Sequence, residues 1–290
     1  MGAILAAIAA HLLYATGDTI SVFANRVLGF RKVVFWAWLA GIPVTIIGLP
    51  FFWIGSGDMT VSSLLWTLGL TVLLSISFFA FNASLEKANA VLAGTIAGSF
   101  PALVVIFSLL WFGETLQASQ VVALFVVFSG MMLASIPFSA IRGHKLRFDR
   151  NLWYAVIAFF GWGIYFTAIR IPIEAQGWFL TGALVSFGGF VSIAGVFLLM
   201  RWSPGKPSLS WRIGYVPAFL GTVLTTVGTY AFSYAIETGK SSIVAPIAGS
   251  YPALYALLAY VIYRDRLERS QEIGVAATLI GVIALSILSA

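Results

Sequence analysis

Three polar side chains share one face of the first long apolar segment of this sequence, residues 3–24. His11, Tyr14 and Asp18 follow one another at intervals of three and four residues, which lines them up along one side of an α-helix. An ionisable group inside an apolar helix costs roughly 2.5–3.5 kcal/mol at the centre of a bilayer unless it is paired or hydrated, so such groups mark binding sites and ion paths. We therefore predict that this face lines a polar cavity.

The chemistry of these side chains is that of binding a cation or a proton. Asp18 would hold a cation or a coupling proton, and His11 would relay the proton, because an imidazole titrates near neutral pH. Each residue also has a structural explanation. Asp18 is near enough to the basic end of its segment to be hydrated or paired with Arg26, and His11 can be a neutral imidazole bonded to a Thr or to a backbone carbonyl.

Hydroxyl groups concentrate in another apolar segment, residues 212–236. Four of them, Thr222, Thr226, Thr229 and Ser233, fall on one helical face. Hydroxyls also bond back to their own helix or join neighbouring helices, but so many on one face favour a hydrated cavity. The predicted substrate-contacting residues are His11, Tyr14, Asp18, Phe78, Asn82, Phe100, Trp162, Tyr165, Thr226, Thr229, Tyr230, Ser233 and Tyr251.

A duplicated motif divides the chain into two similar halves. The stretch Ile96-Ala-Gly-Ser-Phe-Pro-Ala-Leu103 returns 151 positions later as Ile247-Ala-Gly-Ser-Tyr-Pro-Ala-Leu254, with seven of eight residues identical. The proline of each copy removes one helical hydrogen bond and predicts a kink, and the glycine before it permits close helix approach. The predicted gating residues are Gly98, Pro101, Gly249 and Pro252.

The composition is that of an integral membrane protein. Only 9% of the residues are charged and mean hydropathy is +1.00, whereas a soluble domain has roughly 25% charged residues. A spanning helix needs about 20 apolar residues, and backbone groups in lipid must be bonded within the helix, so the fold class is all-α. The sequence predicts ten spans: 3–24, 33–54, 62–85, 89–112, 118–139, 151–171, 178–200, 212–236, 241–263 and 270–289.

The distribution of positive charge predicts the topology. Of the 16 Lys and Arg residues, 14 follow odd-numbered spans, and only Arg170 and Lys240 lie on the other side. The positive-inside rule then places the charged side in the cytoplasm and both termini outside. Because each half has five spans, the halves insert in opposite orientations, as in an inverted-repeat transporter. The predicted units are residues 1–141, a basic linker 142–150, and residues 151–290.

Nearly the whole chain resembles the drug/metabolite transporter superfamily, in particular its ten-helix EamA-type members. The resemblance rests on the duplicated motif, on the acidic turn that follows each copy, and on a Gln and a late Gly in the next helix. The residues that carry it are Glu114, Asp265, Gln120, Gln271, Gly130 and Gly281. The Trp162-Gly163 pair of the second half matches the family, whereas the first half has His11-Leu12. The resemblance implies transport of small metabolites, often driven by a proton gradient, and favours export.

The sequence thus predicts a secondary transporter for a small organic metabolite, with no enzymatic activity. One acidic residue, aromatic rings and many hydroxyls favour an amine or an amino acid as the substrate. A polyanion would require Lys or Arg inside the membrane, and the sequence has neither deep in a span. A lipid flippase or a channel of the same fold is the alternative, and a lipid substrate would require a cavity that opens sideways to the bilayer. A membrane enzyme would need a clustered Asp and His metal set or paired carboxylates, which the sequence lacks.

The remaining expectations concern cofactors, partners and location. The absence of Cys excludes disulfides and thiolate metal sites, and we predict no metal and no cofactor. The partners are a small-molecule substrate and the lipid bilayer. The basic residues punctuate apolar segments, which argues against nucleic acid despite a pI of 9.7. We predict a multi-pass protein of the bacterial inner membrane, as a monomer or a weak homodimer.

Overall fold

A computed structural model describes residues 1–28, 30–52, 57–87, 90–136, 138–139, 150–201, 211–264 and 267–290. Most of the predicted linker 142–150, and Asp265 with it, lie outside these residues. The helices are α1 (Gly2–Leu28), α2 (Phe30–Phe52), α3 (Val61–Lys87), α4 (Ala90–Gly98), α5 (Phe100–Trp111), α6 (Ala118–Ser135), α8 (Leu152–Ala168), α9 (Arg170–Gln176), α10 (Trp178–Leu199), α11 (Trp211–Thr238), α12 (Ser241–Gly249), α13 (Tyr251–Tyr263) and α14 (Arg269–Ser289).

Ten helical stretches within the described residues are long and apolar enough to cross a membrane. Eight of them agree with the predicted spans to within three residues at each end, and the fifth ends at Ser135, four residues before the predicted end. The sixth is longer than predicted, because α8 and the short α9 together cover residues 152–176 with a turn at Ile169. The prediction of an all-α membrane protein with ten spans is confirmed.

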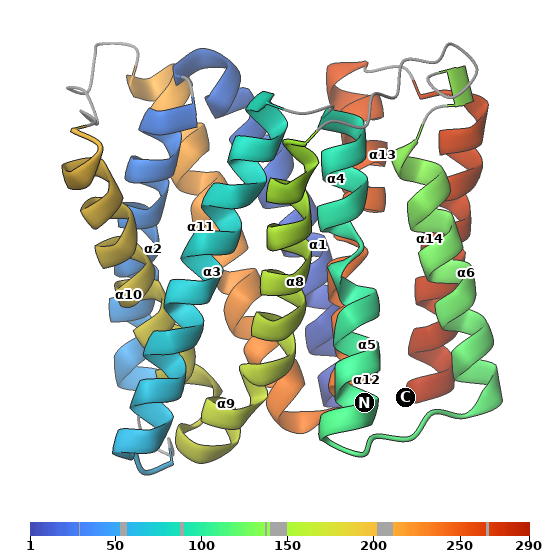
Figure 1. The fold of residues 1–290 in the computed structure, drawn as a ribbon, viewed down its shortest axis with the longest axis horizontal. Coiled ribbons are helices and arrows are strands. Elements are labelled where there is room, and N and C mark those ends of the chain that lie inside the picture. Colours follow the sequence, from blue (N-terminus) through green and yellow to red (C-terminus); the bar gives the residue numbers. More distant parts are fainter. Residues whose placement is uncertain are drawn as a thin grey trace.

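The helices form one layered bundle in which α1 packs along α11 and α8 packs along α3. These two pairs are equivalent under the sequence repeat. In Figure 1 both termini lie at the lower end, where α9 and the connection from α5 to α6 also lie. From that end α1 ascends, whereas α8 descends from the opposite end toward α9. The first helices of the two halves therefore run in opposite directions.

Both copies of the duplicated motif interrupt their helices, as the prolines predict. The fourth span breaks at Ser99 between α4 and α5, and the ninth breaks at Ser250 between α12 and α13. Each proline occupies the second position of the following helix, where its missing N–H costs no helical bond. The two breaks also touch, since a Cβ on Gly249 would lie 2.7 Å from Cγ of Pro101.

The final helices of the halves, α6 and α14, pair at the right of Figure 1. Their approach requires glycine, because a Cβ on Gly130 would lie 2.5 Å from the backbone nitrogen of Thr278. The repeated glutamines support the pair from both ends. Gln120 Nε2 donates to Ser289 Oγ at 3.1 Å, and Gln271 Nε2 donates to the Ala134 carbonyl at 3.1 Å.

The same glutamines also cap the N-termini of their own helices. Gln120 Oε1 accepts from the backbone N–H of Gln117 at 2.9 Å, and Gln271 Oε1 accepts from that of Glu268 at 3.1 Å. These bonds satisfy helix N–H groups that have no partner within the helix. The repeated Gln of the family pattern is therefore explained by helix capping and by the α6–α14 contact.

Candidate functional site

His11 of α1 binds the helix break of the second half. Its Nδ1 lies 2.8 Å from the carbonyl oxygen of Ile247, which the break at Ser250 leaves outside the regular helical ladder. A carbonyl only accepts, so Nδ1 carries a proton and donates it. The Ser250 hydroxyl donates to the same carbonyl at 2.9 Å. This is the backbone-carbonyl partner that the structural explanation of His11, a neutral bonded imidazole, requires.

Asp18 contacts the other side of the same break. The Tyr251 hydroxyl, on the first residue of α13, faces the Asp18 carboxylate and interacts with it. The side chain of Arg26, the alternative partner considered for Asp18, lies outside the described part of the chain. His11 and Asp18 therefore attach α1 to the end of α12 and to the start of α13.

Tyr14 lies between these two attachments and joins them to α11. Its ring is 5.5 Å from that of Tyr251, and its hydroxyl donates to Thr229 Oγ1 at 3.3 Å. Thr229 in turn donates to the Thr225 carbonyl within α11 at 3.0 Å. Four of the predicted residues, Tyr14, Asp18, Thr229 and Tyr251, thus form one polar group, which we call the Asp18 cluster.

Glycines on α1 and α11 bring the Asp18 cluster together. A Cβ on Gly17 would lie 2.7 Å from the Gly221 carbonyl oxygen, and one on Gly228 would lie 3.1 Å from the Tyr14 ring. Any larger residue would separate the two helices, because the facing atoms are backbone or a buried ring. Small residues of this kind are how membrane helices approach closely.

An aromatic group occupies the equivalent place around the break of the first half. The Trp162 ring lies 5.7 Å from Phe100 and 5.1 Å from Phe81, and Phe100 stacks on Phe166 at 4.9 Å. Tyr165 is buried beside Phe166, with the ring centroids 4.9 Å apart. The sequence offset aligns Asp18 with Ile169 and Tyr251 with Phe100. The two breaks are therefore chemically different, one polar and one apolar.

Several predicted residues lie in other contacts. Phe78 packs near Val34, Ile193 and Phe197, in a cluster where α2, α3 and α10 meet. Tyr230 bonds to Thr45 Oγ1 at 2.8 Å, and its ring stacks on Phe179 at 5.0 Å. Both residues therefore take part in packing of α2 and α10 rather than in the Asp18 cluster.

The other predicted polar residues lie on α3 and α11. Asn82 Nδ2 donates to the Phe78 carbonyl one turn earlier at 2.7 Å. Thr226 faces α2, where a Cβ on Gly41 would lie 3.2 Å from Thr226 Oγ1, and Ser233 is buried in α11. Of the hydroxyl face predicted for residues 212–236, Thr229 is the residue that reaches the Asp18 cluster.

A polar contact that the sequence analysis did not predict lies at the lower end of Figure 1. Glu114 accepts from Arg170 Nη1 at 2.5 Å and from the backbone N–H groups of Ser241 and Ser242 at 2.8 and 2.9 Å. Arg170 Nε also pairs with Glu174, four residues later in α9, at 2.5 Å. One sequence signal did exist, because the residue before α12 is Lys240, which cannot cap the helix as an Asp, Asn, Ser or Thr would.

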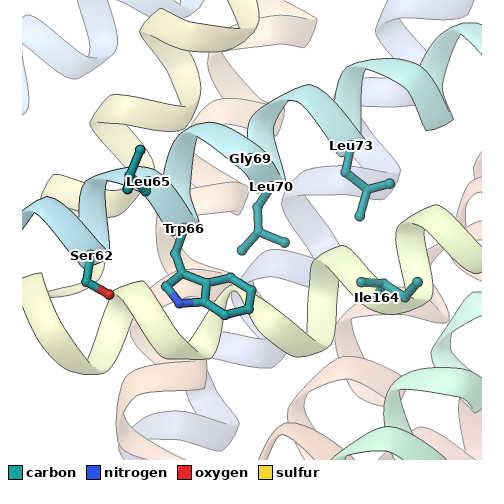
Figure 2. A pocket seen from close by; sticks show the side chains of 7 residues that line it. All are labelled: Ser62, Leu65, Trp66, Gly69, Leu70, Leu73 and Ile164. Atoms are coloured by element: carbon teal, nitrogen blue, oxygen red, sulfur yellow. The ribbon is translucent and has the colours of Figure 1, made fainter.

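A groove of about 490 Å³ lies on the surface of α3 beside α8. Figure 2 shows its lining, which is mostly apolar, with the Ser62 hydroxyl and the Trp66 ring nitrogen as its polar side-chain atoms. The lining residues are Ser62, Leu65, Trp66, Gly69, Leu70, Leu73 and Ile164. Leu65 is 63% exposed and Trp66 45%, so the groove opens to the outside of the bundle. It contains none of the predicted site residues.

Cofactor ligands do not gather in the part of the chain that the structure describes. No three His, Cys, Asp or Glu side chains come together there as a metal ion requires.

Comparison with known proteins gives a match of residues 1–136 and 150–287 to a family described as the EamA-like transporter family. An uncharacterized protein of Methanocaldococcus jannaschii is 36% identical over 70 residues, which is 24% of this chain and 51% of that protein. The chain thus spans about half the length of this relative. An uncharacterized transporter of Archaeoglobus fulgidus is 22% identical over 72% of this chain and 70% of its own.

A solved crystal structure has the same fold. It superposes with a TM-score of 0.76 over 99% of this chain and 97% of its own, at 20% sequence identity. At this identity the likeness concerns the fold alone. The ten-span architecture is therefore found in an experimentally determined protein.

Proposed function

Because this chain belongs to the EamA-like transporter family, we propose that it is a secondary active transporter that exports a small organic cation or zwitterion, such as an amine or an amino acid. The family and the transporter named among its relatives support transport across a membrane. The substrate class is argued from the side chains of the site. The proposed location is the cytoplasmic membrane, with both termini outside.

The Asp18 cluster is the observation that carries this proposal. It combines one carboxylate, two phenol rings and a threonine hydroxyl within the membrane-spanning helices. A carboxylate attracts an ammonium group, and aromatic faces hold cations by their quadrupoles. The Tyr251 hydroxyl leaves acceptor sites of Asp18 for a further donor, since a carboxylate accepts about four hydrogen bonds.

Asp18 is also the group that we propose exchanges substrate for a proton. With the carboxylate protonated, a cationic substrate loses its counter-charge and leaves; with the proton gone, the next substrate binds. Asp18 thus holds either a proton or the substrate, and binding of one lowers the affinity for the other. This competition is sufficient to couple proton movement to substrate movement. His11, about two helical turns before Asp18 on α1, serves as the proton relay in the proposal, and its Nδ1 is bonded to the Ile247 carbonyl.

The two halves serve, in this proposal, as inverted repeats that alternate the access to Asp18. The contact of the two helix breaks at Pro101 and Gly249 lies where the halves meet. Broken helices in membrane transporters form substrate sites and permit one bundle to rock against the other. Gly98, Pro101, Gly249 and Pro252 would then be the hinge positions.

Proteoliposomes that contain a pH-sensitive dye test the proposal. Amines, amino acids, sugars and nucleosides are added in turn, and proton movement is followed with and without an imposed pH gradient. We expect one amine or amino-acid class to move protons in the wild type and none in Asp18→Asn. Asp58→Asn, the same change in an exposed loop, should behave as the wild type. Equal proton movement in Asp18→Asn would exclude Asp18 as the coupling group.

A lipid-handling transporter is the second candidate, and the groove of Figure 2 favours it because it opens to the outside of the bundle. Gly69 leaves space there, since no atom lies within 4 Å of the position that a Cβ would occupy. Gly69→Phe should fill the groove. If Gly69→Phe stops the movement of a fluorescent lipid between leaflets and the wild type moves no metabolite, the lipid function replaces the first proposal.

A further inference from the structure

The Glu114 contact joins the two halves of the molecule at the end where both termini lie (Figure 1). Glu114 belongs to the connection between α5 and α6 of the first half, and its partners Arg170, Ser241 and Ser242 belong to the second half. Among the described residues, Arg170–Glu114 is the one ion pair that crosses between the halves. We call Glu114, Arg170, Ser241 and Ser242 the Glu114 latch.

The latch is buried and its donors are well matched to a carboxylate. The Glu114 side chain is 5% exposed and accepts three hydrogen bonds from one guanidinium and two helix N–H groups. The N-terminus of α12 carries partial positive charge, which adds to that of Arg170. Charge-assisted bonds of this kind are about twice as strong as neutral ones. A carboxylate bound in this way holds the α5–α6 connection firmly on α12.

Neighbouring contacts strengthen the same connection. Lys240 Nζ donates to the Thr115 carbonyl at 2.7 Å, and the Arg170 guanidinium lies 5.0 Å above the Phe112 ring. Arg170 and Lys240 are the two positive residues that the topology prediction places on the sparsely charged side. Both are therefore used to hold residues 112–115 of the first half.

At the opposite end of the molecule, the position that matches Arg170 carries no cation. The sequence offset aligns Glu114 with Asp265, which lies outside the described residues, and it aligns Arg170 with Thr19. Thr19 instead donates to the Ala15 carbonyl of its own helix at 2.7 Å. The sequence therefore differs between the two ends at the position of the latch arginine.

We infer that the Glu114 latch is the gate of this end: it holds the two halves closed there, and its separation opens the path to the Asp18 cluster. This inference rests on the proposed function in treating the closed end as one of two alternating openings. In alternating access, the halves must separate at this end. Arg170 and the N-terminus of α12 must then leave Glu114.

A single cysteine in this cysteine-free chain reports the separation. Ser242 is fully buried and its hydroxyl has no hydrogen-bond partner in the described structure, so Ser242→Cys loses no side-chain hydrogen bond seen there. A thiol reagent reacts with it only when the latch opens, so the labelling rate follows the open population. No substrate is needed for this measurement, so a failure of the proposed substrate or coupling leaves it interpretable.

The test compares labelling of Ser242→Cys in purified protein with and without a second substitution. Glu114→Gln and Arg170→Gln should each raise the rate roughly tenfold or more, because a hydrogen bond to a charged group is worth at least one tenfold step. Glu174→Gln is the matched control, since it removes the exposed partner of the same arginine. An unchanged rate in Glu114→Gln, or an equal rise in Glu174→Gln, would overturn the inference.

A second reporter separates gate opening from a general loss of packing. Ser286 is buried in α14 and is 7% exposed. With Glu114→Gln, the labelling of Ser286→Cys should stay at the wild-type rate. A parallel rise at Ser286 would mean that the pair stabilises the whole bundle, and the inference of a local gate would then be wrong.

Discussion

The hydroxyl of Tyr251 is the one heavy atom by which the second copy of the motif differs from the first, and it faces the Asp18 carboxylate. In the proposed site it orients the carboxylate and leaves the remaining lone pairs for an ammonium group. The Tyr14 ring, 5.5 Å away, limits where that group can sit. At the scale of residues, selectivity thus depends on a phenol that the first half replaces with Phe100.

Tyr251→Phe should weaken substrate binding without disturbing the fold. The ring contact with Tyr14 remains. In the proposed site the Tyr251 hydroxyl bonds to the charged Asp18, and loss of such a bond costs about 1.5–3 kcal/mol, or roughly 10–100-fold in Kd. Titration calorimetry with the substrate class found in proteoliposomes measures the change. Tyr260→Phe, an exposed tyrosine of the same helix, should bind as the wild type. If both variants bind alike, Tyr251 does not orient Asp18.

His11 makes a distinct prediction about stability. His11→Leu leaves the Ile247 carbonyl with the Ser250 hydroxyl alone, and a poorly satisfied buried polar group costs about 1–3 kcal/mol. His11→Asn retains a donor and should recover part of this loss. Thermal unfolding in detergent measures both variants. If His11→Leu is as stable as the wild type, the carbonyl contact has no structural role and His11 is free for proton transfer.

At the scale of elements, the breaks at Ser99 and Ser250 and the α6–α14 pair have separate roles. The break at Ser250 exposes a backbone carbonyl, that of Ile247, to His11 of α1. The α6–α14 pair has glycine contacts and capping glutamines at both ends, so it forms a rigid unit at the edge of the bundle. Movement of the halves is therefore expected around the breaks and not within this pair.

Gly130→Ala tests the α6–α14 contact. The new methyl group would meet the Thr278 backbone nitrogen at 2.5 Å, and overpacking of this kind costs about 1–3 kcal/mol. Gly195→Ala in α10 is the control, because no atom lies within 4 Å of that Cβ position. Thermal unfolding should separate the two variants. Equal melting temperatures would mean that α6 and α14 adjust at little cost.

At the scale of the whole molecule, hydropathy and the motif predicted the spans and their breaks, because bilayer thickness and proline chemistry act on the local sequence. Rotation of the helices could not be predicted in the same way. Both the lipid-facing and the inward faces of these helices are apolar, so nothing local distinguishes them. Tyr230 illustrates this, since its hydroxyl faces Thr45 of α2 rather than Asp18.

Contacts between residues far apart in the chain were the second feature that could not be predicted from the sequence. Glu114 and Arg170 are 56 residues apart and come from different halves, so only the fold brings them together. The local pair of Arg170 with Glu174 was predictable from helical spacing, and the structure confirms it. The Asp18 partner Tyr251 was within the predicted set, but their contact required knowledge of how α1 crosses the second break.

The orientation of the molecule can be measured with two acidic, exposed positions at opposite ends. Asp58 lies just before α3, which begins at the lower end of Figure 1, and Glu272 lies in the first turn of α14, which begins at the upper end. In intact cells, an impermeant maleimide should label Asp58→Cys at once and Glu272→Cys only after permeabilisation, as the positive-inside rule predicts. The reverse pattern would place both termini in the cytoplasm.

The difference between the two helix breaks determines how much charge the proposed mechanism moves across the membrane. Ile169 stands where the second half would carry its own Asp18, so in the proposed mechanism one chain exchanges one proton at one carboxylate per cycle. Exchange of that proton for a singly charged amine moves no net charge and is insensitive to membrane voltage. Exchange for a zwitterion moves one charge and is worth about 2.3 kcal/mol per 100 mV. The voltage dependence of transport would therefore identify the charge of the substrate.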